Sequence, residues 1–246
     1  MLVGLVISVP IAAVDGVPAR LHGAAWLWLA LSGGGNVVGL IFSYQAYRRG
    51  NVTLVVPIVS SEGGVAALIA IFAGEALGTG TAVALVLAAA GVCVASIPAR
   101  GGTGGQSSDH VWTVAFSLGA ALVFGVSLYA TGKAGALLPA TWVVPAARVV
   151  GTAVITLPLA LRGRLRITRR AAPLVLASGI CEVLGFFSYT LGTRHGIAVT
   201  AVLGSQFAAI SVIVAYFLFR ERMSRLQWIG VGTIIVGVSL LSAFNA

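Results

Sequence analysis

Charged residues are scarce in this chain of 246 residues. Asp, Glu, Lys and Arg make up 9% of it, whereas soluble domains carry about 25%. So small a fraction could not cover the surface of a water-soluble globule with charge. Apolar residues account for 59% of the chain. The composition therefore excludes an ordinary soluble domain and predicts an all-α polytopic membrane protein surrounded by a lipid bilayer.

Residues that bind metals or carry out catalysis are also few. The 3 histidines and 2 cysteines form no HxxxH, CxxC or HExxH spacing, so no metal site and no cofactor are expected. An enzyme acting on lipid would need a nucleophile and a base, or metal ligands, at one membrane interface. The sequence shows no such constellation, and no enzymatic activity is expected.

Acidic residues are outnumbered, with 6 Asp and Glu against 15 Lys and Arg. Most of the arginines lie in the segments 48–51, 98–110, 162–171 and 220–225, between apolar runs. This placement is typical of cytoplasmic loops, so the excess charge is interpreted as a topology signal and no nucleic-acid partner is expected. The same distribution predicts a multi-pass protein of the plasma membrane, with Met1 inside and the C-terminus outside.

Long apolar runs are what the sequence has in abundance, and a membrane helix needs about 20 apolar residues. The candidate spans cover residues 1–14, 26–47, 52–73, 79–97, 111–131, 140–161, 172–193, 197–219 and 226–244. Residues 98–110 are rich in Gly and Ser and are predicted to form a flexible linker. The sequence thus predicts about nine transmembrane helices in two groups.

The two groups are copies of one unit, because residues 182–242 match residues 36–96 without a gap. Identical pairs include Arg48/Arg194, Gly50/Gly196, Glu75/Glu221 and Gly91/Gly237. Residues 111–246 are predicted to form a repeat of five helices, and residues 1–97 an earlier, N-terminally truncated repeat of four. A start upstream of Met1 is favoured over a protein with nine true spans. An odd number of helices per complete copy inverts the copies across the membrane, as in many secondary transporters.

Several segments of both copies carry a family resemblance. They are Pro57-Ile-Val-Ser-Ser-Glu62-Gly-Gly-Val-Ala-Ala-Leu, Gly74-Glu75-Ala-Leu and Gly91-Val, then Arg220-Glu221-Arg-Met-Ser-Arg-Leu-Gln-Trp-Ile-Gly-Val-Gly and Gly237-Val238. The pattern resembles the EamA family of the drug/metabolite transporter superfamily. The resemblance implies two inverted five-helix repeats that move small organic metabolites or drugs. The chain departs from the family in lacking the first helix and in having Gly63 where members often have Pro. Members also have a cytoplasmic C-terminus, in contrast to the orientation that the arginines predict.

Three ionisable residues lie inside apolar runs, where a charge at a helix centre costs about 2.5–3.5 kcal/mol on insertion scales. They are Glu62, Arg148 and Glu182. Arg148 and Glu182 lie near the middle of neighbouring antiparallel helices, so they are predicted to form an ion pair or to face one aqueous cavity. The alternative is that this pair only holds two helices together. Glu62 has Ala208 as its repeat partner, which favours a role specific to one half. That role is proton coupling or binding a cationic group, unless Glu62 only bonds Ser60, Ser61 or a neighbouring helix.

Uncharged polar and aromatic residues on matching helices are predicted to line a central substrate site. They are Asn36, Ser43, Tyr44, Gln45, Tyr189, Thr190, Ser205 and Gln206, with Asn36 as the repeat partner of Glu182. Glu75 and Glu221 recur in both copies and are interpreted as parts of the fold.

The function expected from these features is secondary transport of a small organic solute by alternating access. Export coupled to proton entry, with Glu62 or Glu182 as carrier, is the favoured mechanism. The alternative is a non-transporting or degenerate membrane protein with a structural or sensing role.

Overall fold

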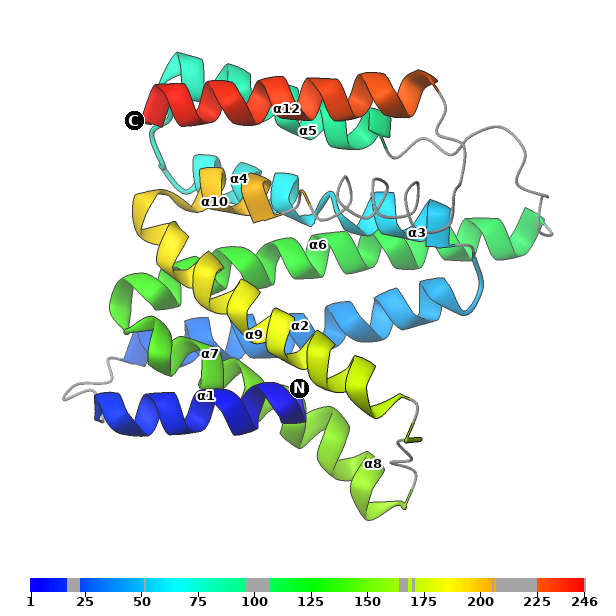
Figure 1. Cartoon of the computed structure of the whole chain (residues 1–246), viewed down its shortest axis with the longest axis vertical. Helices are drawn as coiled ribbons and strands as arrows, with labels where there is room; N and C mark the ends of the chain where they lie inside the picture. Colours follow the sequence, from blue (N-terminus) through cyan, green and yellow to red (C-terminus); the bar gives the residue numbers. More distant parts are fainter. Residues whose placement is uncertain are drawn as a thin grey trace. The chain divides into compact units, whose positions relative to one another are not determined.

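The computed structural model describes residues 1–16, 23–50, 52–95, 107–163, 168–169, 171–204, 206 and 225–245. Every secondary-structure element in these ranges is a helix (Figure 1), which confirms the all-helical prediction. The α-helices are α1 (Leu2–Asp15), α2 (Gly23–Tyr47), α3 (Val52–Val59), α4 (Glu62–Phe72), α5 (Thr79–Ala95), α6 (Ser107–Leu137), α7 (Ala140–Gly151), α8 (Leu157–Leu161), α9 (Ala172–Gly192), α10 (Ile197–Gly204) and α12 (Arg225–Asn245). A π-helical segment, Thr152–Thr156, joins α7 to α8, and a 3-10 turn, Thr193–His195, follows α9.

Four helical segments of the described chain are long and apolar enough to cross a membrane. They are Gly23–Tyr47, Val111–Leu137, Ala140–Leu161 and Ala172–His195. Shorter apolar helices cover Leu2–Asp15, Glu62–Phe72, Thr79–Gly91 and Trp228–Gly237. All of them coincide with apolar runs of the sequence, whereas the number of nine spans stays a prediction.

The run 52–73 was predicted as one continuous helix, and this prediction is wrong because α3 ends at Val59 and α4 begins at Glu62. Pro57, which has no N–H to donate, weakens the hydrogen-bond ladder just before the break. The Ser61 hydroxyl donates to the Ile58 carbonyl at 2.7 Å and stabilises the turn. Glu62 therefore lies in the first turn of a new helix instead of the middle of a continuous one.

The predicted linker 98–110 also differs in part from the structure. Residues 107–110 belong to α6, while residues 98–106 lie outside the described residues. The segment Ser107-Ser108-Asp109 contains residue types that are frequent at the start of a helix. A Gly- and Ser-rich composition concealed this helix start.

The chain divides into two compact units, and each unit contains residues of both predicted repeats. Unit 1 comprises Met1–Val38 and Val126–His195, and unit 2 comprises Gly39–Gly125 and Gly196–Ala246. The helices α2 and α6 contribute to both units.

Within unit 1, α1 and α7 pack side by side in antiparallel directions (Figure 1). At one end the Trp142 indole donates to the Gly16 carbonyl at 2.8 Å, and at the other end Met1 contacts Gly151. The face of α1 turned inward carries the small buried residues Gly4, Ser8 and Ala12. Small residues at this spacing let apolar helices approach closely, and they bring α1 against the helices that hold the charged pair.

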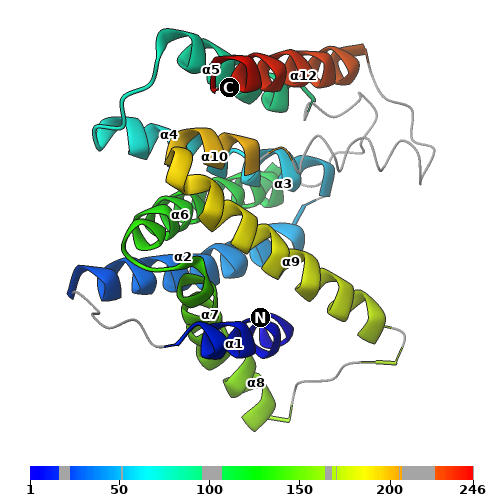
Figure 2. The same ribbon diagram turned by 60° about the vertical axis from the view of Figure 1, so that its left-hand side comes forward.

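Within unit 2, α5 and α12 lie against each other, as Figures 1 and 2 both show. A Cβ atom at Gly91 would lie 2.7 Å from the Ile234 backbone nitrogen, and one at Gly237 would lie 2.7 Å from the Ala88 backbone nitrogen. Ala88 and Ile234 are equivalent positions of the two repeats, as are Gly91 and Gly237. The contacts are therefore reciprocal, and because position 88 meets 237 while 91 meets 234, the two equivalent helices run antiparallel.

Candidate functional site

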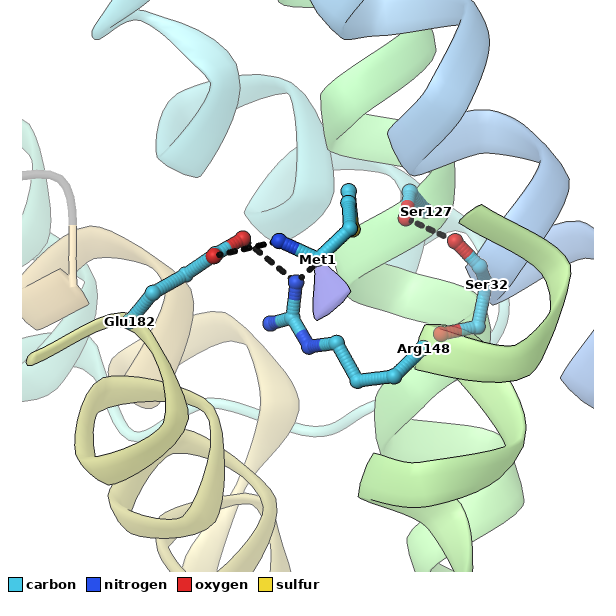
Figure 3. Close-up of polar contacts among 5 residues, drawn as sticks. All are labelled: Met1, Ser32, Ser127, Arg148 and Glu182. Carbon is cyan, nitrogen blue, oxygen red and sulfur yellow. Dashed lines mark hydrogen bonds and ion pairs between the residues drawn. The ribbon is translucent and has the colours of Figure 1, made fainter. Parts of the chain in front are cut away.

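A buried ion pair joins α7 to α9 in unit 1. The Nη1 group of Arg148 donates a hydrogen bond to Oε1 of Glu182 (Figure 3). The ion pair predicted from the sequence is thus present in the structure. Its two members differ in burial, since the exposed fraction is 1% for the Arg148 side chain and 34% for that of Glu182.

The guanidinium of Arg148 is held by apolar and aromatic neighbours. Its central carbon lies 4.4 Å from the centroid of the Phe186 ring, a distance at which the ring face attracts a cation. Nη1 also lies 3.3 Å from the Met1 sulfur. A Cβ atom at Gly4 would lie 3.2 Å from the Arg148 Cδ atom and 3.0 Å from Val183. The glycine thus leaves the room through which the arginine side chain passes.

Several polar atoms close to Arg148 in the sequence or on α1 are buried without a hydrogen-bond partner in the described structure. They are Arg148 Nε, Arg148 Nη2, Thr141 Oγ1, Thr152 Oγ1 and Ser8 Oγ. Thr152 lies one helical turn beyond Arg148, so both project from the same face, and it begins the π-helical segment. Such bulges are frequent at functional sites. A purely structural ion pair would use its donors more completely, because a buried donor without an acceptor is costly.

The Glu182 carboxylate is more accessible than the Arg148 guanidinium. The α-ammonium group of Met1 lies 3.7 Å from the second carboxylate oxygen, Oε2 (Figure 3). The carboxylate therefore has a cationic neighbour on each oxygen. An acceptor that is about one-third exposed can exchange partners without a rearrangement of the surrounding helices.

Three other residues of the predicted site, Asn36, Tyr189 and Thr190, lie in unit 1. Thr190 is buried, and its hydroxyl donates to the Phe186 carbonyl at 2.8 Å. Tyr189 is buried, and its hydroxyl donates to the Leu128 carbonyl of α6 at 3.0 Å. Asn36 is also buried, and its side-chain oxygen has no partner among the described residues. Tyr189 thus connects α9 to α6, while the Asn36 oxygen remains an acceptor without a described donor.

The remaining predicted site residues belong to unit 2. Glu62 lies at the break between α3 and α4. Tyr44 is exposed. Gln206 donates to the Val202 carbonyl at 3.0 Å, and its side-chain oxygen is buried without a partner in the described chain. Ser205 and Glu221 lie outside the described residues.

Glu75 has a role that the sequence indicated only in general terms. Its carboxylate oxygens accept the backbone N–H groups of Ile197 and Ala198, each at 3.1 Å. These are free donors at the beginning of α10, where a negative charge is also favoured by the helix dipole. The preceding Gly196 has φ 137°, a conformation that favours glycine. Glu75 is a helix cap in the fold.

Sequence reasoning missed Phe186 and Gly4 as neighbours of the ion pair. Phe186 follows Glu182 by one helical turn, and this spacing could have placed both on one face of α9. No signal in the sequence identified Gly4, because its role depends on how α1 packs on α7.

Apolar helices around a buried ion pair are typical of a membrane protein with a functional site inside the bilayer. The profile of the EamA-like transporter family matches residues 111–243. The chain belongs to this family, which is part of the drug/metabolite transporter superfamily. It is therefore a membrane protein, and membership points to a transporter and away from an enzyme.

Comparison with solved structures shows that the fold is shared. Nineteen chains match, and one of them, a crystal structure of a protein, has a TM-score of 0.79 and 18% sequence identity. The alignment covers 99% of this chain and 84% of that chain. A search of the curated proteins finds no match.

Proposed function

We propose that the protein is a multi-pass secondary transporter of the plasma membrane that exports a small organic metabolite or drug by alternating access. Residues 1–97 and 111–246 would form the two inverted repeats, joined by the segment 98–110. No cofactor is required, because the driving force would be an ion gradient.

The inversion is supported by the contact between α5 and α12. These helices are equivalent in the two repeats, and their reciprocal Gly91 and Gly237 contacts run antiparallel. Equivalent helices of two repeats that shared one orientation would run parallel. Inverted repeats exchange their conformations when the transporter opens to the other side of the membrane.

The observation that carries the proposal is the Arg148–Glu182 pair inside the apolar helices α7 and α9. Ionisable residues within a membrane span are expensive and are by default functional. Unpartnered donors on Arg148 and an accessible carboxylate on Glu182 suit binding of a polar solute. Asn36, Tyr44, Tyr189 and Gln206 are proposed as further parts of the solute path.

Proton coupling is assigned to Glu62 or Glu182. Glu62 begins α4 at the break in its helix pair, and broken helices are common at the ion and substrate sites of transporters. A carboxylate that takes up a proton from one side and loses it to the other would couple solute export to proton entry.

The test uses the full chain purified and reconstituted into proteoliposomes, with a pH gradient imposed across the membrane. Uptake of a solute panel is measured for the wild type, Glu62→Gln and Glu182→Gln, each normalised to the folded protein recovered. Glu75→Gln serves as the matched control, because Glu75 caps a helix and is not proposed to carry a proton. We expect a flux that depends on pH in the wild type and in Glu75→Gln.

Loss of the pH dependence in at least one of the other two variants would support the coupling. Flux that stays equally pH-dependent in both variants contradicts it. A wild type that moves no solute of any class favours a non-transporting protein over a carrier.

A further inference from the structure

The guanidinium of Arg148 uses only one of its three nitrogens for contacts with described residues. Nη1 carries the bonds to Glu182 and Met1 in Figure 3, whereas Nε and Nη2 are buried and carry none. Arg148 is 1% exposed, so bulk water does not satisfy these donors in place of protein. The unused donors thus belong to a deeply buried charge of unit 1.

Nε and Nη2 lie on one edge of the planar guanidinium, and their N–H groups point outward in parallel. This spacing matches the two oxygens of a carboxylate, which an arginine edge binds through two charge-assisted hydrogen bonds. A lysine ammonium keeps the charge but cannot present two parallel donors in a fixed plane. The Nε and Nη2 edge therefore selects a carboxylate by the spacing of its two oxygens as well as by its charge.

The surroundings of this edge favour an organic anion over a strongly hydrated inorganic one. The Phe186 ring covers one face of the guanidinium, and Val183 and Gly4 lie alongside the arginine side chain. Apolar neighbours of this kind exclude water and strengthen the electrostatic attraction within the site. They also provide contacts for the apolar part of a solute.

From these observations we infer that the solute carries a carboxylate, which binds the Nε and Nη2 edge of Arg148 while Glu182 remains on Nη1. The inference rests on the proposed transport function and names its substrate class. In this arrangement Arg148 is shared between the solute and Glu182, and Glu182 determines the charge balance of the site.

Charge balance gives the inference a second consequence. Arg148 and the α-ammonium group of Met1 carry two positive charges and Glu182 carries one negative charge, so the three groups together carry one positive charge. A bound carboxylate would neutralise this charge in a medium that penalises net charge. Benzoate, which has no cationic group, should therefore bind at least as strongly as the zwitterion 4-(aminomethyl)benzoate.

The experiment measures thermal stabilisation of the purified full chain in detergent. The probes are benzoate, its neutral amide benzamide, the cation benzylammonium and the zwitterion 4-(aminomethyl)benzoate. We expect both carboxylates to raise the unfolding temperature, benzoate at least as much as the zwitterion, and benzamide and benzylammonium to leave it unchanged.

Variants assign the effect to Arg148. Arg148→Lys should weaken carboxylate binding by at least about tenfold, because the parallel donors are lost while the charge is kept. The matched control Arg162→Lys makes the same exchange at an exposed arginine after α8 and should bind like the wild type. If Arg148→Lys does not fold, the double variant Arg148→Met with Glu182→Leu takes its place, because replacing both charges of a buried pair by apolar residues often restores stability. Benzoate should not stabilise this double variant.

Outcomes that overturn the carboxylate assignment differ from those that overturn transport. Stabilisation by benzylammonium or benzamide alone removes the carboxylate inference and leaves a transporter of another solute class. Equal carboxylate binding by Arg148→Lys and the wild type moves the site away from Arg148. A chain that responds to no probe and carries no solute in proteoliposomes contradicts both proposals.

Discussion

The Glu75 carboxylate accepts the backbone N–H of Ala198 at 3.1 Å, although the two residues are separated by half the length of the chain. Its other oxygen accepts the N–H of Ile197, so one side chain satisfies two donors at the beginning of α10. The equivalent position in the other repeat is Glu221, which lies outside the described residues. The glutamate that is part of the family resemblance in the sequence thus has a physical role as a helix cap.

Glu75→Gln should lower the unfolding free energy by about 1 kcal/mol, the usual loss when a helix cap is removed. The amide keeps one acceptor oxygen but loses the charge and turns a donor toward backbone donors. Chemical unfolding in detergent measures the difference. Asp15→Asn, which removes an exposed carboxylate at the end of α1, is the control, and an equal loss in both variants would show that Glu75 is not a cap.

Gly91→Ala and Gly237→Ala should each destabilise the protein by about 1–3 kcal/mol, the range for overpacking a close contact. Each new Cβ would lie 2.7 Å from a backbone nitrogen of the facing helix. A backbone atom, unlike the end of a flexible side chain, cannot move aside to relieve the contact. Because the two contacts belong to one pair of helices, the double variant should lose less than the sum of the single losses.

Gly232→Ala on α12 is the matched control for the glycine variants, since nothing lies within 4 Å of its added Cβ. It should be neutral or slightly stabilising, because Ala favours a helix over Gly. A thermal unfolding series measures all of them. Tolerance of Ala at both Gly91 and Gly237 would contradict the close packing of α5 on α12.

Breaking the Arg148–Glu182 pair should have an unequal effect on stability. Removing Glu182 leaves a guanidinium that is 1% exposed without its partner. Removing Arg148 leaves a carboxylate that is 34% exposed without its partner. Loss of one partner of a buried pair costs about 3–5 kcal/mol, so Glu182→Gln should lie near that range and Arg148→Met should lie below it.

The double variant Arg148→Met with Glu182→Leu separates a structural role from a functional one. Replacing both charges by apolar residues often restores stability, so the double variant should unfold close to the wild type. Transport in proteoliposomes should nevertheless be abolished. Transport at the wild-type rate in a stable double variant would mean that the pair only holds α7 and α9 together.

Thr131→Val should destabilise unit 1 by about 1–3 kcal/mol, because two hydrogen bonds are lost and the buried Ser32 hydroxyl is left without this partner. Thr131 Oγ1 lies 2.6 Å from the Ser32 hydroxyl and donates to the Ser127 carbonyl at 2.8 Å. Valine has the same shape but cannot make either bond. Thr233→Val, which removes a hydroxyl that donates to the Ile229 carbonyl of its own helix, should have a smaller effect in the same unfolding measurement.

Much of this architecture was predictable from hydropathy alone. The apolar runs located the helices because a chain in lipid must satisfy its backbone hydrogen bonds within each segment. The charged residues within the runs 140–161 and 172–193 also predicted that Arg148 and Glu182 pair or face one cavity, since neighbouring membrane helices are antiparallel and an isolated charge is costly there.

Other features were not predictable because they depend on local geometry that composition conceals. The apolar run 52–73 does not show that α3 ends at Val59, since a proline within an apolar segment either bends a helix or breaks it. The start of α6 at Ser107 was concealed in a Gly- and Ser-rich segment. In both places the helix begins or ends without any change in the hydropathy pattern, so the pattern does not reveal the boundary.

The sequence by itself determined that this is a helical membrane protein of repeated design with a charged pair within its spans. Only the tertiary structure decided that Arg148 keeps two donors unused, that Phe186 covers its guanidinium and that Glu75 caps α10. The reason is physical: hydropathy and spacing depend on residues near one another in the chain. Hydrogen-bond satisfaction, in contrast, depends on which distant helices pack together.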